Sequence, residues 1–242
     1  MAKVFRSGAA SLTTSLAEYW KGDSLTGFYA SNVLTNNNSV TIGATGGPTS
    51  GSGKAFDLGS TNLTKYLSIG SALGFTGNGA FTFACWIKTA GVMEADGRLL
   101  YMNTPAANDI LITIIETSLN PGNIRFRRTA DVVDDPIEVV DAALHFVCIR
   151  WTANTLTGNV DARTAVTVAS STTSGEGAGE QTSIGAHSAG IQHWTGQISE
   201  CGFWTKKLAD SEVTDLYNAG AGNTMIESSP TGGLLMASLA LR

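Results

Sequence analysis

The sequence predicts an all-β protein, a sandwich of two antiparallel sheets with one short helix near the C-terminus. Many short segments alternate apolar and polar residues with a period of two, and glycine and proline separate them at short intervals. No long helical pattern lies between the strands, so a parallel α/β sheet is disfavoured. A chain of 242 residues is long enough to bury the core of one large sandwich.

The predicted strands begin near residue 55 and run to residue 205. The strand at 80–89 is apolar on both faces, with Cys85 on one face and Trp86 on the other, as in the centre of a sandwich. A hairpin is expected over 145–162. The remaining strands are expected at 55–59, 65–70, 98–103, 109–117, 123–129, 165–172 and 182–187.

The last strand and the helix are predicted between residues 196 and 220. In "GQISECGFWTK", alternation places Ile198, Glu200, Gly202 and Trp204 on one face and Ser199, Cys201, Phe203 and Thr205 on the other. A helix of about two turns follows in "LADSEVTDLYNAG" (208–220). Asp210 or Ser211 is expected to cap its start, and Gly220 its end. The residues expected to fasten it to the sandwich are Val213, Leu216 and Tyr217.

Composition and charge indicate a globular protein and argue against a nucleic-acid partner. Hydrophobic residues make up 43% of the chain and charged residues 14%, and the formal net charge is −5. The densest basic run, "RFRR", is interpreted as a strand with Ile124 and Phe126 on one face. Arg125 and Arg127 then lie on the other, solvated face, so the run needs no nucleic acid to explain it.

The three cysteines, Cys85, Cys148 and Cys201, each lie in an apolar strand. An odd number without a CxxC pair predicts reduced, buried thiols rather than disulfides or a metal site. The N-terminal residues lack the apolar stretch of a signal peptide, and no run approaches the roughly 18 apolar residues of a membrane span. We therefore expect synthesis and folding in a reducing cytoplasm.

Five ordered segments carry a family pattern: "LAEYWKGD" (16–23), "GKAFDLGSTNLTKYLSI" (53–69), "GAFTFACWIKT" (79–89), "ALHFVCIRWTANTLTGNVDA" (143–162) and "WTGQISECGFWTKKLADSEVTDLYNAG" (194–220). No single motif is specific, but the ordered set resembles the laminin-G-like branch of the concanavalin A-like lectin/glucanase superfamily. The resemblance implies a jelly-roll sandwich over residues 16–220. Residues 1–15 would then form an N-terminal arm, and residues 221–242 a C-terminal arm or docking tail.

Three positions depart from the pattern of that family. Its Asp-Gly after the His strand is Thr152-Ala153 here, its later Asp-Gly is Asp161-Ala162, and its Asp-Glu after Gly-x-Ile is Ser199-Glu200. Laminin-G-like proteins often bind one calcium ion at a rim of the sandwich, so the resemblance implies calcium as a candidate ligand. The three changes argue against a calcium site of this kind in the present chain. No cofactor is predicted, and the metal ligands stay open.

No catalytic residue is predicted, because carboxylates at a glycosidase spacing are missing from the sequence. Glu138 and Asp141 are the nearest candidates, but residues three apart face opposite sides of a strand. Asp131, Asp134 and Asp135 are expected in a solvated loop. The resemblance implies a structural, hydrogen-bonded role for His145 at the start of its strand.

Two regions are candidate binding sites. His187, His193 and Trp194 lie in a predicted rim loop, where a ring beside polar groups would suit sugar stacking. The aromatic residue that relatives have at the Trp194 position usually packs inward, which is the alternative. The apolar run near the C-terminus would dock on its own sandwich or on a neighbouring subunit. Its candidate docking residues are Leu234, Leu235, Met236, Leu239 and Leu241.

Together these features fit a non-enzymatic virion structural protein, such as a bacteriophage capsid decoration or tail-fibre protein. Its expected partners are the major capsid protein or other virion proteins and further copies of itself, and its expected location is the virion surface. This step rests on the resemblance, because tailed phages often carry sandwiches of this family. The alternative is a carbohydrate-binding lectin or adhesin that contacts cell-surface glycans, and a glycan hydrolase comes third.

Overall fold

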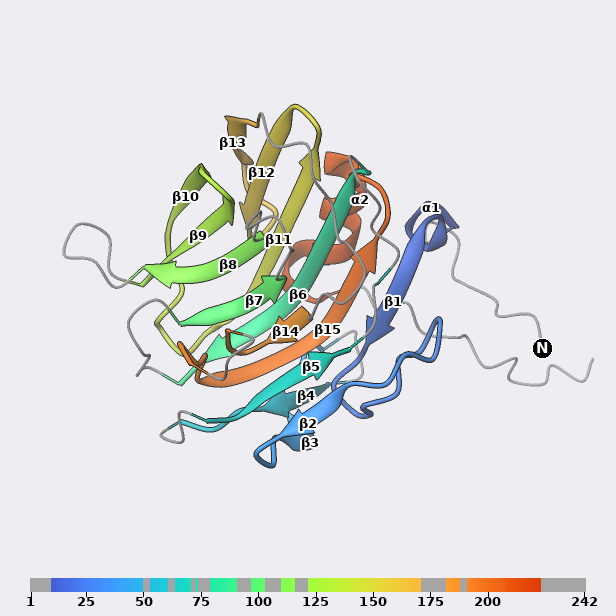
Figure 1. Ribbon diagram of the computed structural model, residues 1–242, viewed down its shortest axis with the longest axis vertical. Coiled ribbons are helices and arrows are strands. Elements are labelled where there is room, and N and C mark those ends of the chain that lie inside the picture. Colours follow the sequence, from blue (N-terminus) through green and yellow to red (C-terminus); the bar gives the residue numbers. More distant parts are fainter. Residues whose placement is uncertain are drawn as a thin grey trace, which may run out of the picture.

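The computed structural model describes residues 10–49, 53–60, 64–70, 73, 79–90, 97–102, 110–115, 122–170, 182–187 and 191–222. These residues form two antiparallel sheets packed face to face, with a short helix near each end of the described chain (Figure 1). The predicted all-β sandwich with one short helix near the C-terminus is therefore confirmed. Within these ranges, no helix is long and apolar enough to cross a membrane.

The eight-stranded sheet has the order β13 (Val166–Ala169), β12 (Thr155–Val160), β11 (Leu144–Thr152), β6 (Phe81–Thr89), β15 (Gly196–Trp204), β4 (Lys54–Asp57) and β3 (Thr41–Thr45), and β1 (Leu16–Trp20) also pairs with β15. The seven-stranded sheet has the order β10 (Asp131–Glu138), β9 (Asn123–Arg128), β8 (Ile110–Ile115), β7 (Arg98–Met102), β14 (Thr182–Ile184), β5 (Tyr66–Ile69) and β2 (Thr35–Asn37). The helical segments are α1 (Ala10–Thr13), α2 (Asp210–Tyr217) and the single 3₁₀ turn η1 (Asn218–Gly220).

The main core lies between the two sheets, and we call it the inter-sheet core. Phe83 and Ile87 of β6 point into it from one sheet, and Phe126 of β9 from the other. Alternation places Trp86 of β6 on the opposite face, where it joins a second core. The apolar character of β6 on both faces thus reflects its position between two cores, as predicted.

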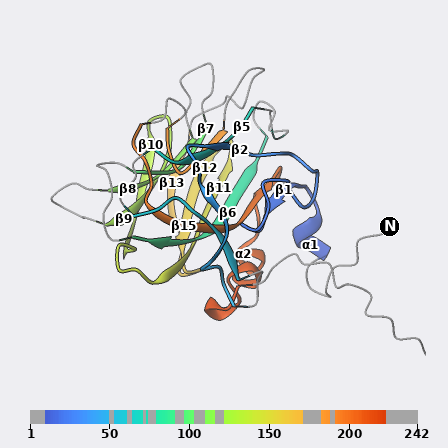
Figure 2. The ribbon, with the colours of Figure 1, turned by 90° about the horizontal axis from the view of Figure 1, so that it is seen from below.

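Helix α2 packs on the outer face of the eight-stranded sheet, the face turned away from the inter-sheet core (Figure 2). Val213 and Leu216 are buried there, and the Tyr217 ring stacks on Trp86 with centroids 5.7 Å apart and planes 13° apart. The fastening role predicted for these three residues of the helix is confirmed. Leu12 of α1 belongs to the same second core and is 1% exposed.

The two ends of α2 differ from the prediction. Ala209 precedes the helix, and its backbone N–H donates to the Glu212 carboxylate at 2.8 Å, so Asp210 is the first helical residue and not the cap. At the other end, Asn218 adopts the left-handed conformation with φ 47°. Gly220, with φ 89°, instead ends the following 3₁₀ turn.

A β-bulge breaks the predicted alternation of β15. Ser199 pairs with Trp86 and Gly202 with Ala84, so β15 holds one extra residue at this point, and Glu200 has φ 52°. Ile198 and Cys201 consequently both face the inter-sheet core. The sequence prediction that placed these two residues on opposite faces is wrong, because a bulge shifts the register by one.

The three cysteines are free and buried, as predicted. Burial raises the pKa of the Cys148 thiol to about 12, with Arg150 opposing the shift and Asp210 adding to it. Burial also raises the pKa of Cys85 well above its usual value. The thiols of Cys85 and Cys148 are therefore protonated packing groups of the strands and not reactive centres.

Candidate functional site: a polar pocket beside helix α2

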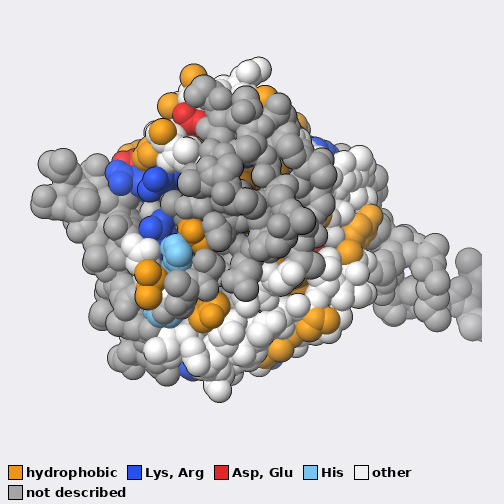
Figure 3. Space-filling view, in the orientation of Figure 1, with side chains coloured by type: hydrophobic (Ala, Val, Ile, Leu, Met, Phe, Trp, Pro, Cys, Tyr) orange, Lys and Arg blue, Asp and Glu red, His pale blue; other side chains and the backbone are white. Residues whose placement is uncertain are grey.

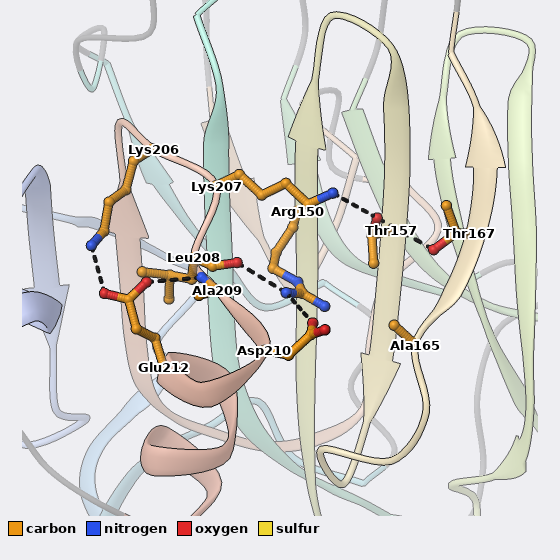
Figure 4. A pocket seen from close by; sticks show the side chains of 10 residues that line it. All are labelled: Arg150, Thr157, Ala165, Thr167, Lys206, Lys207, Leu208, Ala209, Asp210 and Glu212. Carbon is orange, nitrogen blue, oxygen red and sulfur yellow. Dashed lines mark hydrogen bonds and ion pairs between the residues drawn. The ribbon is translucent and has the colours of Figure 1, made fainter.

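A polar pocket of about 570 Å³ opens on the outer face of the eight-stranded sheet, beside the start of α2 (Figure 4). Its walls are the segment that joins β15 to α2 and the outward side chains of β11, β12 and β13. It combines hydroxyl groups, amino and guanidinium groups and two carboxylates. Convergent donors and acceptors of this kind suit a polar ligand.

The sheet register explains why distant residues meet in the pocket. Arg150 of β11 pairs with Thr157 of β12, and Thr157 pairs with Thr167 of β13. Directly paired residues of antiparallel strands share a face, so these three side chains form one row. The Thr167 hydroxyl lies 3.5 Å from the Thr157 hydroxyl, at the open edge of the sheet.

Arg150 is the fixed cation at the base of the pocket, and its side chain is only 2% exposed. Its Nη1 donates to the Leu208 carbonyl at 2.9 Å and lies 2.7 Å from an Asp210 carboxylate oxygen. Its Nη2 donates to Asn159 Oδ1 at 2.7 Å. The arginine thus ties β11 to β12 and to the segment before α2.

Two lysines border the pocket, and their surroundings differ. Lys206 forms an ion pair with Glu212 at 2.6 Å. Lys207 instead donates to the Thr157 hydroxyl at 3.3 Å. Burial lowers the pKa of Lys207, the positive charge of Arg150 lowers it further, and Asp210 opposes both. No motif in the sequence indicated either lysine or Arg150 as a site residue, although an arginine within the apolar run "HFVCIRW" was a signal.

The rim residues predicted to contact sugar lie elsewhere. Trp194 is fully buried in the inter-sheet core, so the prediction that its ring faces a ligand is wrong. His193 is 4% exposed and lies beside Tyr66, with ring centroids 6.3 Å apart. His187 is half-buried against Tyr101, with centroids 4.0 Å apart, and a ligand contact there stays a prediction.

The outer face of the seven-stranded sheet carries the basic strand that the sequence indicated. Arg127 of β9 is exposed, and Arg125 forms an ion pair with Asp134 of β10 at 2.8 Å. Ile124 and Phe126 are buried on the opposite face, which confirms the predicted alternation. Figure 3 shows basic and histidine side chains close together on the visible face of the molecule.

His145 has the structural role that the resemblance implied. Its Nδ1 lies 2.8 Å from Asp161 and its Nε2 lies 3.0 Å from Asp141. The hydrogen bond with Asp161 raises the pKa of His145, burial opposes the shift, and the bond with Asp141 adds to it. Asp161 also accepts the Phe146 backbone N–H at 2.9 Å, so this group holds the start of β11 to the end of β12.

Glu138 and Asp141, the carboxylates that come nearest to a glycosidase spacing in the sequence, differ in their surroundings. Burial alone would raise the pKa of Asp141, but hydrogen bonds from the Ala143 N–H and from His145 outweigh it and hold the pKa below its usual range. A carboxylate held ionised in this way is unsuited to the role of general acid. Glu138 is exposed at the end of β10.

The other predicted features of the acidic region are corrected by the structure. The solvated loop predicted around Asp131, Asp134 and Asp135 is wrong, because these residues belong to β10 and Asp135 is 2% exposed. In the described part of the chain, no group of three His, Cys, Asp or Glu side chains is arranged to hold a metal ion. The predicted docking residues Leu234, Leu235, Met236, Leu239 and Leu241 lie outside the described residues.

The two-layered jelly roll and its polar surface pocket define a lectin-like sandwich. A laminin-G family model, described as the concanavalin A-like lectin/glucanases superfamily, matches residues 59–214. The chain belongs to this superfamily, which confirms the resemblance seen in the sequence. A comparison with curated protein sequences found no match.

Solved structures of similar fold include several binding domains. One is domain 4 of AbnA, a GH43 extracellular arabinanase from Geobacillus stearothermophilus, in complex with arabinotriose; it has a TM-score of 0.64 and 15% identity, over 83% of this chain and 97% of that chain. Another is the binding domain of botulinum neurotoxin DC in complex with SialylT, with a TM-score of 0.61 and 12% identity, over 85% of this chain and 51% of that chain. A third is the binding domain of Paraclostridial Mosquitocidal Protein 1, with a TM-score of 0.64 and 12% identity, over 85% and 52%.

This chain spans about half the length of the two toxin binding domains. At these identities the likeness concerns the fold alone.

Proposed function

We propose that this chain is a non-enzymatic carbohydrate-binding protein and that the pocket beside α2 holds the glycan. The observation that carries the proposal is the row of hydroxyl, guanidinium and amino groups formed by Arg150, Thr157, Thr167 and Lys207. Sugar hydroxyls both donate and accept hydrogen bonds, so they can match such a mixed set. The lectin-like fold of the chain supports the same proposal.

The carboxylates of the pocket are placed to position cations rather than to act on a substrate. Asp210 pairs with Arg150 at 2.7 Å, and Glu212 pairs with Lys206 at 2.6 Å while accepting the Ala209 N–H. A glycosidase instead uses two carboxyl groups that flank the scissile bond, one of them as a general acid. Binding without hydrolysis is the function that these contacts support.

A glycan array probed with the full chain tests the proposal, followed by titration calorimetry with each bound sugar. Thr167→Val removes an exposed hydroxyl from the pocket and keeps the shape of the side chain, so we expect weaker binding of the sugars that the array identifies. Thr35→Val is the matched control, because Thr35 is an exposed threonine on β2 of the other sheet. An array without any bound glycan would overturn the proposal, and equal loss in both variants would overturn the assignment of the pocket.

We further propose that the chain acts at the surface of a virion, as a capsid decoration or tail-associated protein. Two features of the sequence favour this setting. Only 14% of the residues are charged, and an apolar run that includes Leu234, Leu235 and Met236 follows the sandwich. Such a run can bind a capsid protein or a second copy of the chain. The two proposals are compatible, since a decoration protein can also bind glycans.

Density-gradient fractionation of the source culture, with the chain followed by mass spectrometry, tests the virion role. Co-banding with DNA-containing particles, in an amount comparable to the capsid protein, is the expected result. Absence from the particles would overturn it and leave the glycan proposal standing. Removal of residues 223–242 tests the tail, because Gly222 still bonds to Tyr217 and closes the described chain. Unchanged assembly after that deletion would exclude the tail as an interaction arm.

A further inference from the structure

We propose that the pocket beside α2 selects acidic glycans, with the acidic group of the sugar bound by Lys207 in front of Arg150. The inference deepens the proposed carbohydrate binding and rests on it. Its basis is the charge arrangement of the pocket, where three cations meet two carboxylates.

Pairing within the pocket leaves one positive charge without an anionic partner. Glu212 forms an ion pair with Lys206 at 2.6 Å, and Asp210 forms one with Arg150 at 2.7 Å. Among the residues that the structure describes, Lys207 has the Thr157 hydroxyl as its one hydrogen-bond partner and no carboxylate within ion-pair distance. An amino group beside a buried guanidinium is a favourable place for an anion.

Arg150 strengthens this site because the two side chains of the Arg150–Asp210 ion pair differ in their exposure to water. The arginine side chain is 2% exposed, whereas the Asp210 side chain is 87% exposed, so water screens the carboxylate and much less the guanidinium. The buried Nε of Arg150 has no hydrogen-bond partner in the described part of the chain. The guanidinium therefore keeps part of its positive field at the base of the pocket.

Two further observations support an anionic ligand. The pocket is bordered by Ala209, Asp210 and Glu212 at the start of the eight-residue helix α2, where the helix dipole favours negative charge. Burial is the main cause of the lowered pKa of Lys207; Arg150 lowers it further and Asp210 opposes both, so the positive charge of Arg150 acts on this amino group. A bound anion would reverse that effect and hold Lys207 in its charged form.

The size and lining of the pocket favour an acidic sugar over a small free anion. The cavity of about 570 Å³ is much larger than one phosphate or sulfate ion needs. Next to Lys207, the hydroxyls of Thr157 and Thr167 extend the polar surface across β12 and β13. A sugar ring placed over these hydroxyls would bring a carboxylate or sulfate substituent to the amino group.

Calorimetric titration of the full chain with four probes tests the inference: trigalacturonic acid, its fully methyl-esterified form, inorganic phosphate and inorganic sulfate. The ester keeps the sugar rings and removes the charges. We expect the acid to bind about tenfold more tightly than the ester in low salt, as one charge-assisted contact contributes, and the difference to shrink at higher ionic strength. Both inorganic ions should bind more weakly than the acid.

Lys207→Met should abolish the preference for the acid, because it should lower the affinity for the acid about tenfold more than the affinity for the ester. Lys54→Met is the matched control, because Lys54 is an exposed lysine on β4 outside the pocket. Equal affinity for the acid and the ester would overturn acidic selection and leave carbohydrate binding intact. Phosphate binding as tight as that of the acid would also overturn it, since the site would then take a free anion. Binding of neither saccharide, together with an empty glycan array, would overturn the proposed function itself.

Discussion

Glu18 is a fully buried carboxylate in β1 that holds the loop between β1 and β2. Its Oε1 accepts the backbone N–H groups of Tyr19, Tyr29 and Ala30 at 2.9, 2.9 and 3.1 Å. Its Oε2 accepts the backbone and side-chain amides of Asn32 at 2.8 and 3.0 Å. Five donors can converge on one side chain because an ionised carboxylate only accepts hydrogen bonds.

The Glu18→Gln substitution keeps the size of the side chain but removes the charge and replaces one oxygen by a donor. If the new NH₂ group takes the place of Oε2, both amides of Asn32 lose their acceptor, and rotation of the Asn32 side chain restores one bond. One buried N–H then stays unsatisfied, at a cost of about 1–3 kcal/mol. The three bonds at Oε1 become neutral and lose about 0.5–1 kcal/mol each.

We therefore expect Glu18→Gln to lower the free energy of unfolding by about 3–5 kcal/mol, which corresponds to a fall in Tm of roughly 10 °C. Urea unfolding followed by tryptophan fluorescence measures the change. Hydrogen exchange of the Tyr29, Ala30 and Asn32 amides should become faster. Glu138→Gln is the matched control, because Glu138 is exposed and should change the stability by less than about 0.5 kcal/mol. Equal unfolding midpoints for the two variants would refute the role assigned to the Glu18 carboxylate.

Three further predictions concern packing and pH. Gly158→Ala should lower the free energy of unfolding by about 1–3 kcal/mol in urea titrations, because the added methyl group would collide with the Phe126 ring across the sandwich; an unchanged midpoint would contradict this close packing. Trp86→Ala should cost about 3–5 kcal/mol and speed hydrogen exchange in α2, since Trp86 is 3% exposed and stacks on Tyr217; protection of α2 at the native level would contradict that contact. His145→Gln should lower the free energy of unfolding more at pH 5.5 than at pH 9. The pKa of His145 is raised in the folded state, so its contribution to stability is fully present below its unfolded pKa of about 6.5. That contribution is lost as the pH rises through the folded pKa. Equal costs at the two pH values would contradict this linkage, and an NMR titration of the imidazole reads the pKa directly.

The sheets and the helix were predictable because each has a periodic pattern set by burial. In β6, Phe83 and Ile87 face one core and Trp86 faces the other, so the strand is apolar throughout. In α2, Val213 and Leu216 recur at helical spacing on the face that packs against the sheet. These patterns depend only on which face of the element is buried, and the spacing of apolar residues in the sequence shows that face directly.

Strand β10 was missed because its residues contradict local strand propensity, for a reason found in the tertiary structure. Strand β10 holds three aspartates and Pro136, which are residue types that strands generally avoid. It lies at the edge of the seven-stranded sheet, where charge and proline are tolerated because one side makes no ladder bonds. Asp134 is further stabilised there by Arg125, at 2.8 Å.

The direction of the Trp194 side chain could not be predicted from the composition of its loop. Its neighbours in sequence are polar residues and glycines, which indicated an exposed rim. In the structure, the backbone N–H of Trp194 donates to the Gly185 carbonyl at 2.8 Å, and the Trp194 ring enters the inter-sheet core. The direction of such a side chain depends on how two separate segments pair, which no local pattern specifies.

Two buried arginines show why the pocket itself could not be located from the sequence. Arg128 lies on the buried face of the basic strand β9 and Arg150 within the apolar strand β11, and they are 1% and 2% exposed. The guanidinium of Arg128 faces inward, 3.5 Å from the centre of the Trp151 ring, and burial lowers its pKa to about 10 with Asp131 opposing the shift. Arg150 faces outward and bonds to the Leu208 carbonyl, 58 positions away in the chain. An arginine within an apolar strand is thus a signal of a special environment, but only the order and register of the strands decide whether that environment is a core or a binding site.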